Sequence, residues 1–195
     1  MLPPAMPPSD TRPPIGRPPT NRLPTSRPPV RLDAGGLAVV FTWSGDRWTH
    51  RVTTGGAAED AGWASLDGPW PPIRDPRWPA SPVLVELSRV ALPQAAAAGG
   101  QAIVGVGLAG RSHFSASIAP DPMVTDGIRF EIACRLHEPP DWLGSTYRVG
   151  QQLMQVTATD AGGPLPRTVV WAYSIGPQGI FGVTGGSASA GEELA

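Results

Sequence analysis

The sequence predicts an all-β protein, namely an antiparallel β-sandwich or flattened barrel of about eight strands. Apolar and polar residues alternate with a period of two in several segments after residue 37, and turns rich in Gly and Pro separate these segments. No amphipathic pattern is long enough for a helix of ten residues. Short strands joined by such turns are typical of sandwiches and barrels. The 195 residues suffice for one well-buried domain.

Composition divides the chain into a disordered Pro/Arg-rich arm (1–34), a single β-sandwich domain (35–183) and a disordered tail (184–195). Residues 12–31 of the arm read RPPIG, RPPTN, RLPTS, RPPV and R, a five-residue repeat led by arginine. Proline fixes φ and removes the backbone donor, so the repeat favours extended polyproline II. We expect residues 1–32 to bury too little apolar surface to become ordered. The predicted role is a solvated spacer, with a ligand for a proline-recognition groove as the alternative.

Charge is distributed unevenly along the chain. Residues 1–32 carry five arginines and one aspartate, a net charge of +4, whereas residues 33–195 carry ten arginines and fifteen acidic residues, a net charge of −5. An acidic folded domain argues against nucleic acid as its partner. The first residues show no secretory signal, and no apolar run is long enough to span a membrane, so we expect a cytoplasmic protein. Its oligomeric state stays open.

The hairpin is the best-defined local element. LAVVFTW and RWTHRVT flank the turn SGD, and the second segment places His50 on its apolar face, where a histidine satisfied by one hydrogen bond is expected. A Pro-rich irregular stretch follows over residues 62–82. The eight predicted strands cover residues 37–43, 47–53, 83–92, 101–109, 114–118, 128–136, 151–159 and 168–175.

The clearest single strand is IRFEIACRL, residues 128–136. Its alternation places Phe130 and Cys134 on the core side and Arg129 on the outer side. One cysteine excludes an internal disulfide and a Cys-based zinc cluster, and this position predicts a buried, inert thiol.

The glycines Gly105, Gly107 and Gly110 have the spacing G-x-G-x-x-G of a dinucleotide-binding turn. That motif requires a following helix whose N-terminus holds the pyrophosphate. The next residues, RSHFSASIAP, alternate as a strand instead, so we predict no cofactor. The strand glycines then form a flat patch under a bulky aromatic side chain or relieve sheet curvature, while Val106 and its apolar neighbours face the other way.

Ser112 and His113 are weak catalytic candidates, which Asp141 would complete as a hydrolytic triad. Neighbours on a strand point to opposite faces, so the serine and the histidine would not hydrogen-bond. A small hydrolytic or nucleotide-binding enzyme centred on residues 105–113 remains the alternative function. His50, His113 and His137 show no metal-ligand spacing, and we predict no metal site.

Tryptophans offer the better functional hypothesis. Trp63, Trp70 and Trp78 fall in the irregular stretch, and Trp142 lies in another loop. Such residues either anchor a loop over a sheet or, when exposed, form an apolar binding platform. The preferred function is a non-catalytic module that binds another protein or an extended ligand through these aromatics or through a sheet edge.

Overall fold

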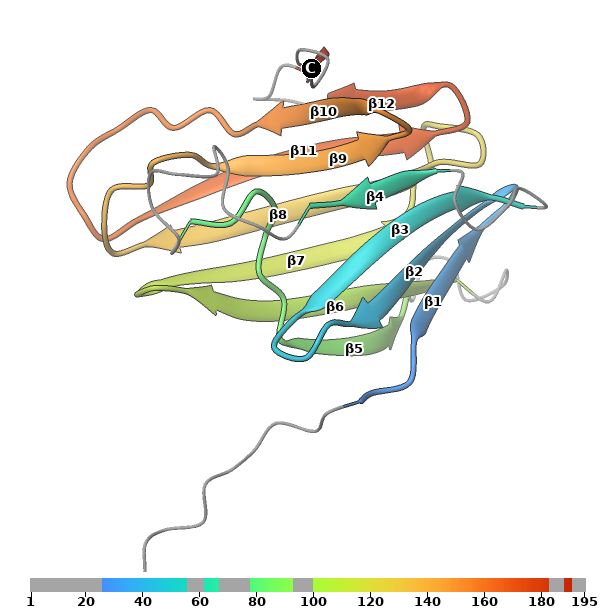
Figure 1. Cartoon of the computed structure of the whole chain (residues 1–195), viewed down its shortest axis with the longest axis horizontal. Coiled ribbons are helices and arrows are strands. Elements are labelled where there is room, and N and C mark those ends of the chain that lie inside the picture. The colour runs from blue at the N-terminus through green and yellow to red at the C-terminus, as the bar shows by residue number, and fades with distance from the viewer. Residues whose placement is uncertain (1–25, 56–61, 67–77, 93–99, 183–187, 191–195) are drawn as a thin grey trace, which may run out of the picture.

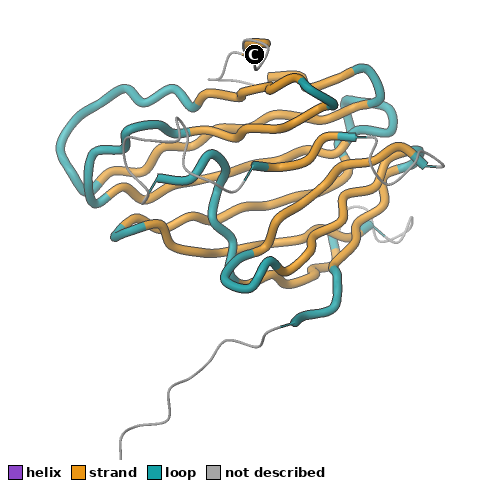
Figure 2. The backbone as a smooth tube through the Cα atoms, in the orientation of Figure 1, coloured by secondary structure: helices purple, strands orange, loops and turns teal. Residues whose placement is uncertain are grey.

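The computed structural model describes residues 26–55, 62–66, 78–92, 100–182 and 188–190 and confirms an all-β antiparallel sandwich. Two sheets pack against each other, one in front of the other in Figure 1. Strands, turns and loops make up the described residues, and no helix occurs in them (Figure 2). That part of the chain accordingly offers no helix long and apolar enough to cross a membrane.

The first sheet holds seven of the described strands, in the order β1-β2-β3-β4-β9-β10-β13. Their bounds are Val30–Ala34 (β1), Leu37–Trp43 (β2), Trp48–Thr54 (β3), Trp63–Ser65 (β4), Gly144–Val149 (β9), Gln152–Thr157 (β10) and Ala188–Ala190 (β13). The predicted hairpin is confirmed as β2 and β3, with Trp43 paired with Trp48 beside the turn.

The second sheet holds six strands, in the order β12-β11-β8-β7-β6-β5. Their bounds are Gly179–Gly182 (β12), Arg167–Gly176 (β11), Ile128–Leu136 (β8), Ser112–Pro120 (β7), Gln101–Ala109 (β6) and Glu86–Ala91 (β5). This sheet therefore carries both the glycine run and the clearest predicted strand.

Period-two alternation decides which face of each strand is buried. In β8 the side chains of Phe130 and Cys134 lie in the core between the sheets, and Arg129 lies on the outer face, as predicted. Burial raises the pKa of the Cys134 thiol to about 12, so the thiol stays protonated and is a poor nucleophile at neutral pH.

The ordered sheet begins earlier than the sequence analysis placed it. Residues 30–34, assigned there to the disordered arm, form β1 and pair with β2 along their whole length. Leu32 and Ala34 are buried in the core, because this short segment alternates apolar and charged residues. The boundary at residue 34 is therefore wrong, and the expectation that residues 1–32 bury too little apolar surface to become ordered fails for residues 30–32. Residues 1–25 lie outside the described residues.

The predicted tail, residues 184–195, also contains an ordered segment. Residues 188–190 form β13, which pairs with β10 from Val156 opposite Ala188 to Met154 opposite Ala190. An edge strand presents unpaired N–H and C=O groups, and a segment of small residues can pair with them because the bonds come from the main chain. The prediction of disorder is thus wrong for these three residues, and the rest of the tail lies outside the described residues.

The part of the chain that the structure describes holds thirteen strands, the eight predicted and five more. The additional strands are β1, β4, β9, β12 and β13. Each has six residues or fewer, which is too short for alternation to stand out from chance. β4 lies inside the stretch predicted as irregular. It pairs with β3 on one side and with β9 on the other, so it joins the two halves of the first sheet.

Candidate binding site

The G-x-G-x-x-G segment is a β-hairpin. Gly105 and Gly107 lie on β6, Gly110 adopts a φ of +56° in the turn, and β7 begins at Ser112. The strand predicted after Gly110 is confirmed. The segment therefore lacks the helix N-terminus on which a dinucleotide pyrophosphate is held.

The two strand glycines allow a neighbouring segment to approach the inner face of β6 closely. A Cβ atom at Gly107 would lie 2.2 Å from the carbonyl oxygen of Val83, and one at Gly105 would lie 2.7 Å from Cδ2 of Leu87. The predicted aromatic cover is therefore wrong, since leucine side chains and backbone occupy this space. The same segment ties the two sheets together, because the carbonyl of Leu84 accepts a 2.7 Å hydrogen bond from the backbone N–H of Trp48.

The hydrolytic triad is not assembled. Ser112 is fully buried, and its Oγ accepts a 3.2 Å hydrogen bond from the backbone N–H of His137, whereas His113 points outward to solvent. The His113 and His137 rings lie 5.7 Å apart, and Asp141 is exposed in the loop after β8. Throughout the described ranges, no group of three His, Cys, Asp or Glu residues is placed to hold a metal ion.

The tryptophans singled out from the sequence are not brought together as an exposed platform. Trp63 on β4 is 9% exposed and Trp78 is 2% exposed, so both belong to the core and anchor the segments that carry them. Trp142 is partly buried and packs beside Gly144. Trp70 lies outside the described residues.

A chain of polar groups crosses the core between the sheets. Nε2 of His50 on β3 lies 2.9 Å from the hydroxyl of Tyr147 on β9, which lies 2.7 Å from the hydroxyl of Tyr173 on β11. Burial lowers the pKa of the His50 imidazole from 6.5 to about 3 and raises the pKa of both tyrosines. His50 is thus a neutral core histidine with one side-chain hydrogen bond, as its place on the apolar face predicted.

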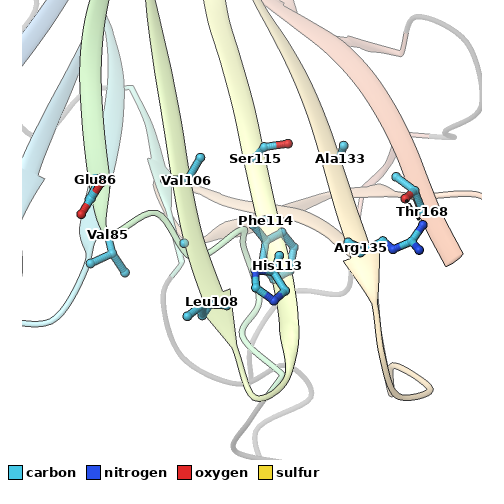
Figure 3. A pocket seen from close by; sticks show the side chains of 11 residues that line it. Val85, Glu86, Val106, Leu108, His113, Phe114, Ser115, Ala133, Arg135 and Thr168 are labelled. Carbon is cyan, nitrogen blue, oxygen red and sulfur yellow. Dashed lines mark hydrogen bonds between the residues drawn. The ribbon is translucent and has the colours of Figure 1, made fainter. Parts of the chain in front are cut away.

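The outer face of the six-stranded sheet carries a groove of about 610 Å³, a volume within the range of ligand sites (Figure 3). Two rows of paired residues cross it, from strand to strand. The first row consists of Glu86, Val106, Ser115 and Ala133, and it continues beyond the groove to Val170. The second consists of Leu108, His113, Arg135 and Thr168. An adjoining hollow of about 310 Å³ shares Val106, Ser115 and Ala133 with the groove and extends it along the sheet.

The groove combines a small-residue floor with apolar and polar edges. Ser115 and Ala133 occupy the middle of the first row, between Val106, which is 51% exposed, and Val170, which is 63% exposed. Leu108 in the second row is 53% exposed. These side chains lie on the outward face of regular strands, so a ligand would meet a surface fixed by the sheet.

Charged and hydroxyl groups lie at the two ends of the groove. The carboxylate of Glu86 is on β5, whereas NH1 of Arg135 on β8 donates a 3.3 Å hydrogen bond to Oγ1 of Thr168 on β11. Figure 3 shows Glu86 on one side of the groove and Arg135 with Thr168 on the other. The arrangement offers a carboxylate acceptor at one end and donors at the other, with Val106, Leu108, His113 and Ser115 between them.

Comparisons with protein-family models, curated proteins and solved structures found no match to this chain. The assignment of function therefore depends on the chemistry of the groove. The sequence patterns did not predict a binding site at the residues that line the groove. The available signal was that residues 101–109 are apolar on both faces, with Val106 and Leu108 opposite the glycines, although a sandwich strand has only one face in the core.

Proposed function

We propose that this protein is a non-catalytic binding module that holds an extended peptide in the groove on the outer face of the six-stranded sheet. The exposure of Val106 and Leu108 in the groove, and of Val170 in the adjoining hollow, is the observation that carries the proposal. Valine and leucine side chains are usually buried, and a group of them exposed on one surface marks an interaction site. A cytoplasmic location belongs to the same proposal.

The length of the groove supports an extended ligand. It crosses five strands from β5 to β11, and neighbouring strands lie about 4.8 Å apart, so it spans about 19 Å. An extended peptide rises about 3.3 Å per residue, and about six residues would fill this length.

The polar groups support a peptide as the class of ligand. A peptide backbone presents donors and acceptors in alternation, and the groove offers the Glu86 carboxylate as an acceptor and the Arg135 guanidinium as a donor. An apolar side chain of the peptide would contact Val106 and Leu108 where the peptide crosses β6. The net charge of −5 over residues 33–195 argues against a polyanionic partner for the same face.

A random peptide library displayed on phage tests this proposal, with the full-length protein immobilised. Enriched peptides are then synthesised with a fluorophore, and their affinities for the wild type and for Leu108→Ser, Arg135→Ala and Val90→Ser are measured by anisotropy. Val90 is the matched control, because it is a valine 38% exposed on β5 of the same sheet and does not line the groove.

The two groove variants are each expected to weaken binding at least about tenfold, which corresponds to about 1.4 kcal/mol, and the control is expected to leave the affinity within about twofold. Thermal unfolding checks that all three variants fold. Failure to enrich any peptide, or equal losses in the groove variants and the control, would overturn the proposal.

A further inference from the structure

The turn end of the β2–β3 hairpin forms an aromatic corner that holds an arginine. We define the corner as Trp43, Trp48 and the backbone carbonyl of Val85. The two indole rings meet edge to face, with centroids 5.4 Å apart and planes inclined by 69°. Cζ of Arg27 lies 4.0 Å from the Trp43 ring centroid and 5.9 Å from that of Trp48.

A backbone hydrogen bond fixes the direction of the guanidinium. NH1 of Arg27 donates to the carbonyl oxygen of Val85 at 2.9 Å. Stacking on an indole face and donating to a carbonyl use two different properties of arginine, its delocalised charge and its fixed donors. Both contacts at the corner suit a guanidinium, which can stack on Trp43 and donate to Val85 at once.

The walls of the corner are held in place without the arm. The backbone N–H of Trp48 donates to Leu84, and the N–H of Val85 donates to Val106 at 2.8 Å, so both sheets fix the segment that supplies the carbonyl. The indole N–H of Trp48 is buried and has no hydrogen-bond partner in the described part of the chain.

The sequence supplies more ligands of this kind than one corner can hold. Arg27 leads the unit RPPV, and the preceding units RPPIG, RPPTN and RLPTS are led by Arg12, Arg17 and Arg22. Each unit places an arginine before a proline-containing pair, as in the unit seen at the corner. Each chain has four arginine-led units, and its corner binds one guanidinium at a time. Three units per chain are therefore available for the corners of other copies of the chain.

We propose that the corner is a binding site for arginine-led proline units and that it accepts such units from the arm of a second copy of this chain. The net charge of +4 on residues 1–32 and of −5 on residues 33–195 favours contact between the arm of one copy and the folded part of another. Arg27 in the same chain competes for the corner, because its tether to β1 gives it a high effective concentration. Removal of Arg27 therefore opens the corner to a second copy.

Sedimentation velocity on the full-length Arg27→Ala variant tests the proposal over a range of protein concentrations. The variant is expected to self-associate at concentrations at least about tenfold lower than the wild type, because its corner is open while three units remain. The matched control combines Arg27→Ala with Arg12→Ser, Arg17→Ser and Arg22→Ser, and it is expected to stay monomeric. Trp43→Phe in the Arg27→Ala background is expected to weaken association several-fold, since phenylalanine stacks on cations less strongly than tryptophan.

A peptide competitor identifies what occupies the corner. The peptide RPPTNRLP, residues 17–24, is expected to dissociate the Arg27→Ala assemblies, and the same peptide with serine in place of both arginines is expected to have no effect. Arg27→Ala that behaves like the wild type, or association that persists without the three other arginines, overturns the proposal. A thermal melt of each variant confirms that it is folded.

Discussion

Lowering the pH from about 7.5 to about 5 is expected to destabilise the fold through His50. Its imidazole has a pKa of about 3 in the folded protein against an ordinary value of 6.5, because it is buried among Phe41, Phe130 and Tyr147. Above about pH 7.5 the imidazole is almost entirely neutral in both the folded and the unfolded state, and stability hardly depends on its titration. As the pH falls from 6.5 toward 3, only the unfolded chain takes up the proton, so the free energy of unfolding falls. At about pH 5 the loss amounts to about 2 kcal/mol.

Urea unfolding of the wild type and of His50→Phe at both pH values measures this loss. Phenylalanine keeps a ring at the site and removes the titration, while His113 and His137 are present in both proteins and cancel in the comparison. The missing hydrogen bond to Tyr147 lowers the stability of the variant by a similar amount at each pH. The wild type should therefore lose about 2 kcal/mol more than the variant on acidification. Equal losses would show that His50 is not held neutral by burial.

Two further predictions concern packing, and both are measured by chemical denaturation. Phe130→Ala should lower the free energy of unfolding by about 3–5 kcal/mol, because the buried ring stacks on Tyr173 with centroids 5.1 Å apart. Arg129→Ala on the outer face should lower it by less than about 0.5 kcal/mol. A larger loss for the arginine variant would mean that the two faces of β8 are reversed. Gly107→Ala should lower the free energy of unfolding by about 1–3 kcal/mol, because the added Cβ would press on the Val83 carbonyl. Gly55→Ala should leave it unchanged, because the added Cβ would lie at an ordinary 3.5 Å from the Gly36 carbonyl oxygen. Equal effects would refute the close approach of residues 83–84 to β6.

Alternation of residue types was sufficient to predict the core faces of the long strands. The burial of Phe130 and Cys134 and the partial burial of His50 follow from a period of two alone, because each strand of a sandwich turns one face to the opposite sheet. The same reasoning failed at β1 and β13. The alternation in the five residues of β1 and the three of β13 is too short to stand out from chance, and each is an edge strand held by main-chain hydrogen bonds to its one neighbour, β2 or β10.

The groove could not be derived in the same way. Val106 and Leu108 are apolar, and the sequence alone does not show whether a third layer covers their face of the sheet. The row from Glu86 to Val170 joins five strands, and it exists only because the strand order places β8 between β7 and β11. Residues 121–166 separate β7 from β11 along the chain and include β8, β9 and β10, so local sequence patterns do not indicate that β8 lies between β7 and β11.

The groove and the aromatic corner meet at the entry to β5. The carbonyl of Val85 accepts the hydrogen bond from Arg27 at the corner, and Val85 also lines the groove next to Glu86. The backbone N–H of Val85 donates to the carbonyl of Val106 on β6. Val85 therefore contacts Arg27 of the arm, strand β6 and the edge of the groove. The arginine repeat and the strand pattern indicate two separate parts of the chain, since nothing in either pattern specifies a contact between residues 58 positions apart. That contact places the last arginine-led unit against the folded domain. The segment before β5 is therefore where an occupant of the corner and an occupant of the groove would be in contact with the same residue.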